Sequence, residues 1–188
     1  MNKKIKVILY FIVTILAING FFNLPIFTDE INKVSEIADR MKMPIPSDSA
    51  VIYYKNTHGG FLGDGMTYGV LKLSDKGNKE FRKTFFKKSV NKLPVTNNIK
   101  KLIKEYFSDD EDIEIGSEEY YISKTVVTFP EEIKKGYYYL IDRNAGDYPG
   151  QKYKSIKDVD LDNACSFDIS MIVYDEGNNE IFFYEIDT

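Results

Sequence analysis

The chain has 188 residues, a formal net charge of −4 and a single cysteine, Cys165. The acidic balance and the absence of zinc-finger spacing argue against a nucleic-acid partner. One cysteine excludes an internal disulfide, so an apolar core must stabilise the fold, with Cys165 as a small buried residue. The sequence contains no cofactor motif, and we expect no cofactor.

The first 27 residues are predicted to anchor the chain in a membrane. Lys3, Lys4 and Lys6 precede a nearly unbroken apolar run from Val7 to Phe27. As a helix, this run would be roughly 30 Å long, which matches the hydrocarbon core of a bilayer. No acidic residue occurs before Asp29, so the positive-inside rule places the N-terminus in the cytoplasm and the rest of the chain outside the membrane.

Two alternatives to a retained anchor remain open. A cleaved signal peptide would use Val7 to Ile18 as its apolar core and be cut near Gly20, which would make the protein secreted. That site lacks an A-x-A pattern and the apolar run continues to Phe27, so the anchor is favoured. A buried N-terminal helix of a cytosolic protein is disfavoured, because a helix that is apolar all round needs a larger core than the remaining chain would provide.

Residues 28–46 are expected to form a helical stalk or a helix that packs on the domain. Thr28 can cap this helix, and apolar residues recur at helical spacing until Pro44 and Pro46 end it. Residues 47–188 then suit one extracytoplasmic domain. Beyond the anchor the chain carries 22 basic and 29 acidic side chains, a formal charge of −7.

The domain is predicted to begin with two strands, Val51–Tyr54 and Thr67–Leu73, which form a wide hairpin because a glycine-rich loop joins them. Two helices follow, marked by apolar residues at helical spacing: Phe81, Phe85 and Phe86 in the first, and Ile99, Leu102, Ile103 and Tyr106 in the second. Both helices are strongly basic.

Further strands are predicted in the C-terminal half at Tyr120–Thr128, Tyr137–Asp142, Phe167–Tyr174 and Ile181–Ile186. Residues 176–179 form a hairpin turn between the last two. Because hairpins outnumber crossover helices, we predict an α+β fold with a mainly antiparallel sheet and two or three helices packed on one face. Residues 143–166, rich in Gly, Asp and Asn, are expected to form a long surface loop.

Three segments, in this order, resemble a family of small, singly anchored Gram-positive proteins of uncharacterised function. They are residues 57–65 (THGGFLGDG), residues 136–143 (GYYYLIDR) and residues 166–188 (from SFD to YEIDT). Similar proteins often carry a second histidine where this chain has Leu62, and a tryptophan ahead of the Leu93–Pro94 pair. The resemblance implies an anchored architecture at the cell envelope, and it implies no activity.

The glycine-rich hairpin loop is the first candidate site. His58 is the only histidine, and Asp64 is its nearest carboxylate in the sequence. This pair could form a general base oriented by a carboxylate, while loop N–H groups could bind an anion at Gly59, Gly60, Gly63 and Gly65. No nucleophile accompanies the pair and a wide turn needs the same glycines, so a structural role is favoured over binding, and binding over catalysis.

An acidic loop is the second candidate. Asp158, Asp160 and Asp162 alternate, and alternating carboxylates can converge on a hard cation such as Ca²⁺. An EF-hand would need glycine where Asn163 stands and glutamate where Ile169 stands. A solvated acidic loop without a metal is therefore the favoured interpretation.

Charge segregation is the third feature. Ten basic residues and one acidic residue lie between Lys76 and Lys104, and residues 105–119 then contain eight acidic residues and no basic one. Ordinary solvated helix faces are slightly favoured over a docking surface. If the positive helices dock on anionic lipid or a wall polymer, the candidate binding residues are Lys83, Lys87, Lys101 and Lys104.

Aromatic triplets at residues 137–139 and 182–184 must place rings on both faces of the sheet. Exposed rings could stack on a sugar or a peptide, although cross-strand pairs on a second covered face are favoured. We therefore predict an anchored extracytoplasmic domain that binds a partner protein, an anionic polymer or lipid at the cell envelope. The alternative is an envelope hydrolase that uses His58 and Asp64.

Overall fold

The computed structural model describes residues 25–59, 64–108, 127–143, 153–161 and 166–188. The predicted anchor lies almost entirely outside these ranges, as does most of the strand predicted at Tyr120–Thr128. Within the described ranges, no helix combines the length and the apolarity needed to cross a membrane.

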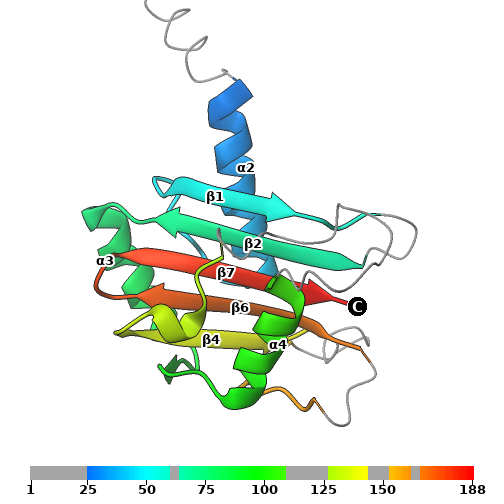
Figure 1. Ribbon diagram of the computed structural model, residues 1–188. Coiled ribbons are helices and arrows are strands. Elements are labelled where there is room, and N and C mark those ends of the chain that lie inside the picture. The colour runs from blue at the N-terminus through cyan, green and yellow to red at the C-terminus, as the bar shows by residue number, and fades with distance from the viewer. Residues whose placement is uncertain (1–24, 60–63, 109–126, 144–152, 162–165) are drawn as a thin grey trace, which may run out of the picture.

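A seven-stranded sheet forms the centre of the domain (Figure 1). Its strands are β1 (Ala50–Asn56), β2 (Gly65–Lys72), β3 (Asn91–Lys92), β4 (Gly136–Asp142), β5 (Lys154–Ile156), β6 (Asp168–Asp175) and β7 (Glu180–Asp187). The spatial order is β1-β2-β7-β6-β4-β3, β5 also pairs with β4, and the pairs are antiparallel. The prediction of an α+β fold with a mainly antiparallel sheet is confirmed.

Three helices of the described chain cover this sheet: α2 (Pro25–Arg40), α3 (Asp75–Phe85) and α4 (Asn97–Phe107). Helices α2 and α3 lie on one face of the sheet and α4 lies on the other (Figure 1). Ile37 of α2 and Phe81 of α3 belong to the core on the first face, whereas Leu102 and Phe107 of α4 belong to the core on the second. The prediction that the helices pack on one face is therefore wrong, because both faces are covered.

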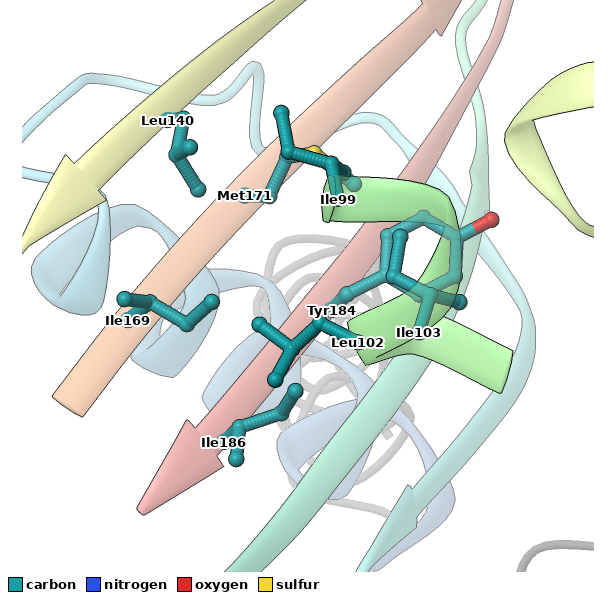
Figure 2. A pocket seen from close by; sticks show the side chains of 8 residues that line it. All are labelled: Ile99, Leu102, Ile103, Leu140, Ile169, Met171, Tyr184 and Ile186. Atoms are coloured by element: carbon teal, nitrogen blue, oxygen red, sulfur yellow. The ribbon is translucent and has the colours of Figure 1, made fainter. Parts of the chain in front are cut away.

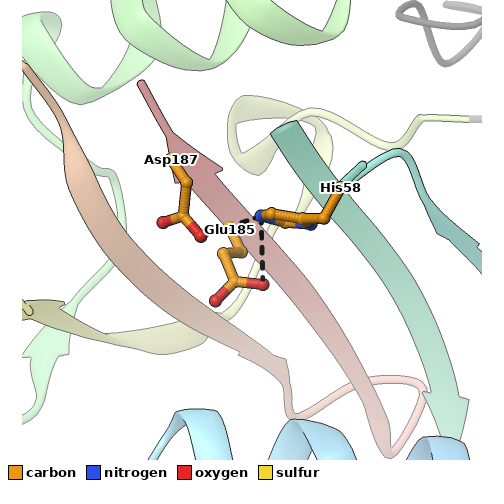
Figure 3. Close-up of side chains that lie close together, drawn as sticks. All are labelled: His58, Glu185 and Asp187. Atoms are coloured by element: carbon orange, nitrogen blue, oxygen red, sulfur yellow. Dashed lines mark hydrogen bonds and ion pairs between the residues drawn. The ribbon is translucent and has the colours of Figure 1, made fainter. Parts of the chain in front are cut away.

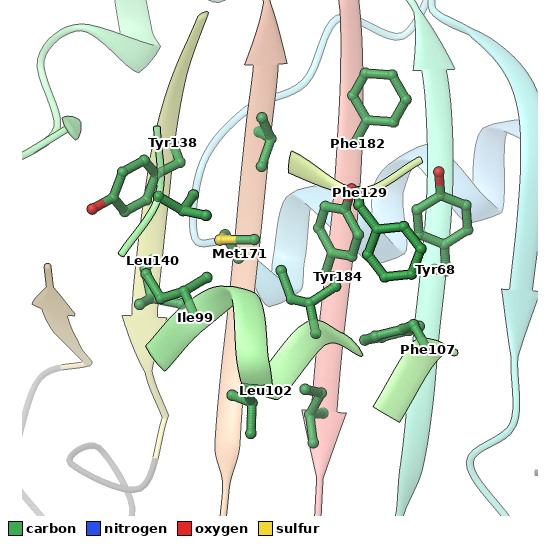
Figure 4. Close-up of a cluster of buried hydrophobic side chains, with 14 of the residues drawn as sticks. Tyr68, Ile99, Leu102, Phe107, Phe129, Tyr138, Leu140, Met171, Phe182 and Tyr184 are labelled. Carbon is green, nitrogen blue, oxygen red and sulfur yellow. The ribbon is translucent and has the colours of Figure 1, made fainter. Parts of the chain in front are cut away.

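Strand β7 shows the physical reason for two covered faces. Phe182 and Tyr184 lie in the core on the face that α4 covers (Figure 4), while Ile181 and Phe183 lie in the core shared with α2 and α3. All four side chains are at most 5% exposed. A strand buried on both sides is apolar at consecutive positions, and it has no polar face to present to water.

Helix α2 packs on the domain from Val34 onward. Val34, Ile37 and Met41 are buried, and Met43 and Ile45 continue the same core beyond the helix. The helix was expected to be either a stalk or a packing helix, and packing is what this part of it shows. Residues that follow the predicted anchor thus belong to the same hydrophobic core as the sheet.

Side-chain caps begin the two short helices. The Ser74 hydroxyl accepts a hydrogen bond from the Gly77 N–H (2.9 Å), and the Thr96 hydroxyl accepts one from the Ile99 N–H (3.3 Å). Such caps satisfy N–H groups that have no partner within the helix. The Thr96 hydroxyl also donates to Asp158, which ties the start of α4 to the segment after β5.

Helix α4 packs closely on the sheet. A cavity of about 10 Å³ remains between them, lined by apolar side chains that include Leu102, Met171 and Ile186 (Figure 2). That volume is at the lower limit for one water molecule, and the apolar lining offers a water almost no hydrogen bonds. The cavity is a small packing gap and not a ligand site.

Candidate functional site at the polar end of the sheet

The face of the sheet covered by α2 and α3 changes from apolar to polar along its strands. On β7, Ile181 and Phe183 are followed at the same two-residue spacing by Glu185 and Asp187. Thr67 on β2 and Ser170 on β6 pair in register with Glu185. We call this region, together with the side chains that contact it, the polar end of the sheet.

Glu185 lies at the centre of the polar end and is 0% exposed. Arg40, from the last turn of α2, donates to its Oε2 atom, and Nη1 of Arg143 lies 2.8 Å from its Oε1 atom. The Ser170 hydroxyl donates to Oε1 at 3.4 Å. A buried carboxylate is tolerated only when it is paired and hydrogen-bonded, and the two arginines meet this requirement.

His58 reaches the same region from the loop after β1. The Thr57 N–H donates to the Met66 carbonyl (2.8 Å), which holds the beginning of the loop against β2. At Gly65, an added Cβ would lie 2.6 Å from the Cα of His58, so only glycine allows this close approach. The ring then places Nε2 2.8 Å from Oδ2 of Asp187 and 4.0 Å from Oε2 of Glu185 (Figure 3).

Asn56 fixes the orientation of the His58 ring. Its Nδ2 atom donates to Glu36 (3.2 Å), and its Oδ1 atom accepts the His58 backbone N–H (2.8 Å), so the amide orientation is defined. The same Oδ1 atom lies 2.7 Å from His58 Nδ1. Because Oδ1 can only accept, Nδ1 must carry a proton, and Nε2 faces the carboxylates.

Burial lowers the pKa of His58 below its usual value, and the positive charges of Arg40 and Arg143 act in the same direction. The negative charge of Glu185 opposes them but does not reverse the effect. Removal from water disfavours the charged imidazolium. The surroundings therefore favour a neutral His58 ring, although its Nε2 atom lies next to a carboxylate oxygen.

The arrangement suits ion binding better than nucleophilic catalysis. Nε2 of His58 and one oxygen each of Glu185 and Asp187 lie within 4.8 Å of one another, and among the described residues they are the group that could hold a metal ion together. A hydroxyl within hydrogen-bonding distance of the ring belongs to Thr67, whose Oγ1 atom is 3.2 Å from Nδ1. Thr67 is 0% exposed, so this hydroxyl cannot reach a substrate.

No protein-family model, curated protein or solved structure matches this chain.

The carboxylate that contacts His58 comes from the far end of the chain. Asp187 makes the 2.8 Å contact, whereas Asp64 is exposed. Of the four loop glycines, Gly65 packs against His58 and Gly59 is exposed, and Gly60 and Gly63 lie outside the described residues.

The acidic residues of the second candidate site are not brought into one cluster within the described ranges. Asp158 accepts hydrogen bonds from Thr96 and from Asn98, and it thereby supports the start of α4. Asp160 is exposed, and Asp162 lies outside the described residues. Asp158 has a structural role that is independent of any metal.

The basic residues of the two helices do not form one surface. Lys83 and Lys87 belong to α3 and the turn after it, whereas Lys101 and Lys104 belong to α4 on the opposite face of the sheet. Lys104 is also paired with Glu131, at 2.6 Å between Nζ and Oε1. A basic docking surface would therefore have to be built from one helix alone.

Four charged residues of the polar end were not singled out from the sequence: Arg40, Arg143, Glu185 and Asp187. One signal could have identified the acidic pair. Glu185 and Asp187 continue the alternate positions of Ile181 and Phe183, so they had to lie on the same face of an otherwise apolar strand. A carboxylate at such a position needs a charged partner nearby.

Proposed function

We propose that the chain is a membrane-anchored extracytoplasmic domain that binds an anionic polymer of the bacterial cell envelope through α3. The observation that carries this proposal is a set of lysines with no partner within the described part of the chain. We call Lys79, Lys83 and Lys87 the α3 lysine row. They are four residues apart and exposed, so Lys79 and Lys83 share one side of α3 and Lys87 continues it into the following turn.

The placement of α2 supports a polymer, and not lipid, as the ligand of the α3 lysine row. The N-terminal end of α2 projects past the β1 edge of the sheet (Figure 1), and the predicted anchor ends there. If that anchor spans the membrane, the β1 edge is the part of the sheet nearest to the bilayer. Phe81 and Phe85 of α3 pack instead on Tyr174 of β6, two strands beyond β2. The α3 lysine row would then lie farther from the headgroups than the β1 edge does.

The hydrolase alternative has weaker support. A hydrolytic site needs a nucleophile or an activated water beside the general base. The hydroxyls of Thr67 and Ser170 are buried at the polar end, and Glu185 is occupied by two arginines. A protein secreted after signal cleavage would carry the same lysine row, and it would differ in location only.

Replacing Lys79, Lys83 and Lys87 together by Ala is expected to weaken binding to a soluble phosphodiester polyanion by about 100-fold. Each lysine near an anionic surface contributes about 1 kcal/mol, and 1.4 kcal/mol corresponds to a tenfold change in affinity. The measurement is a binding titration of the full-length chain in neutral detergent at several salt concentrations. Wild-type affinity should fall as salt rises, since salt screens exposed charges.

A matched triple variant on α4 is the control, with Lys100, Lys101 and Lys104 replaced by Ala. It removes the same number of charges from the opposite face, and its affinity should stay within about threefold of wild type, since 0.6 kcal/mol corresponds to that factor. Equal losses of affinity in both variants would show that binding depends on net charge and not on the α3 lysine row. Stronger binding to anionic vesicles than to the polyanion would show that lipid is the ligand.

A further inference from the structure

The polar end presents three ligand atoms of the types that bind transition metals. Nε2 of His58 lies 2.8 Å from Asp187 Oδ2 and 4.0 Å from Glu185 Oε2. These separations fall on either side of the roughly 3.4 Å between ligand atoms around tetrahedral Zn²⁺, which follows from metal–ligand bonds of about 2.1 Å. The ligand oxygens of Glu185 and Asp187 lie within 4.8 Å of each other, so side-chain adjustments alone would bring the three atoms into position.

The hydrogen bonding of His58 leaves its Nε2 atom facing oxygen atoms. Asn56 accepts the Nδ1 proton, because the orientation of its amide is fixed. A metal-binding histidine commonly donates its other ring N–H to an oxygen in this way, which fixes the tautomer and the ring. In the neutral ring, Nε2 of His58 and Oδ2 of Asp187 both present lone pairs across 2.8 Å, and a cation between them would turn this contact into an attraction.

The net charge around His58 is negative and would favour a divalent cation. Glu185, Asp187, Glu36 and Asp168 are acidic, and Arg40 and Arg143 are basic, so the six side chains sum to −2 before His58 is counted. Both arginines form ion pairs with carboxylate oxygens, as outer-shell partners of ligating carboxylates do. Each oxygen can accept such a hydrogen bond and still offer a second lone pair to a metal.

We propose that His58, Glu185 and Asp187 bind one divalent transition-metal ion of the Zn²⁺ type. A ligand set of one imidazole and two carboxylates favours such an ion over Ca²⁺, which takes six to eight oxygen ligands. The side chains of His58 and Asp187 are 13% and 17% exposed, so water or another small ligand can complete the coordination. The site rests on no part of the α3 proposal, because none of its residues belongs to α3.

The test is a titration of the full-length chain in neutral detergent, after removal of metals with a chelator, with Zn²⁺ alone. Calorimetry is expected to show one ion per chain. Co²⁺ in place of Zn²⁺ should give the visible absorption of a nitrogen- and oxygen-ligated ion. The thermal midpoint should rise with metal concentration, because an ion that binds only the folded state stabilises it.

Variants identify the ligands. His58→Ala and Asp187→Asn should each lower the Zn²⁺ affinity at least 100-fold, and Asn56→Ala should lower it 10- to 100-fold because it removes the partner that orients the ring. Asp64→Asn, in the same loop, is the matched control and should bind like wild type. Circular dichroism without metal shows which variants remain folded, and His58 lies in a loop outside the strands of the sheet.

The proposal is overturned if the wild-type chain binds no Zn²⁺ at micromolar concentration, or if His58→Ala retains the wild-type affinity and stoichiometry. It is also overturned if nitrogen NMR shows protons on both ring nitrogens of His58 in the presence of a saturating concentration of Zn²⁺. In that case a proton, and not a metal, would link the ring to Asp187.

Discussion

Replacing Glu185 by Ala is expected to lower the free energy of unfolding by about 3–5 kcal/mol, because removing one partner of a buried ion pair leaves uncompensated charge. Glu185 is 0% exposed, and both Arg40 and Arg143 are bound to it. Without the carboxylate, the two guanidinium groups would remain at the end of the sheet without their shared counterion. Urea unfolding of the full-length chain measures the change.

Glu180→Ala is the control for this prediction. Glu180 begins the same strand, and its pair with Lys72 (3.2 Å) is partly exposed, with the side chains 26% and 44% accessible. Exposed pairs contribute about 0–1 kcal/mol, so this variant should lose at most that amount. If the Glu185 and Glu180 variants lose equal stability, the polar end is not the charged centre that the structure indicates.

Phe183→Ala is expected to cost about 3–5 kcal/mol, the usual range for emptying a buried phenylalanine site. Phe183 is 0% exposed and points to α2 and α3 from β7. Since β7 lies between β2 and β6, the cavity would form at the middle of the sheet, where neighbouring strands cannot easily collapse into it. Thermal and urea unfolding both report the loss.

Phe86→Ala provides the comparison for Phe183→Ala, because the same side chain is 38% exposed at the end of α3. Its loss should be clearly smaller, about 1 kcal/mol, in line with less area buried against Tyr137. A large loss at Phe86 together with a small one at Phe183 would contradict a core centred on β7.

Most secondary structure could be predicted from the sequence because each signal is local. Apolar spacing identified α3 and α4, and the turn at residues 176–179 identified the β6–β7 hairpin. The short strands β3 and β5 were missed. They have two and three residues, too few for any periodic pattern, and they form only because β4 offers an edge to pair with.

The arrangement of the helices could not be predicted from local pattern alone. Hairpin connectivity indicated an antiparallel sheet, but it does not specify on which face each helix packs. The consecutive apolar residues of β6 and β7 were the available signal, since a sheet with one solvated face would alternate. The aromatic triplets gave the same indication, because Phe182 belongs to the core on the α4 face and Phe183 to the core on the opposite face.

The candidate site was predicted in part. His58 was singled out from its glycine-rich loop, but its partner was sought at Asp64, six residues away. The structure places Asp187 beside it, 129 residues further along the chain. Only the pairing of β2 with β7 brings the two segments together, and strand pairing over that distance has no signature in a single sequence.

The central claim is that the domain lies outside the membrane and is held there by its own N-terminus. Thiol labelling on intact cells tests it most directly, using Ser89→Cys, at an exposed position after α3, in a Cys165→Ser background. We predict that a membrane-impermeant maleimide labels this chain on intact cells and that the labelled chain sediments with membranes. Labelling only after lysis, or recovery of the full-length chain free in the cytosol, would contradict the claim.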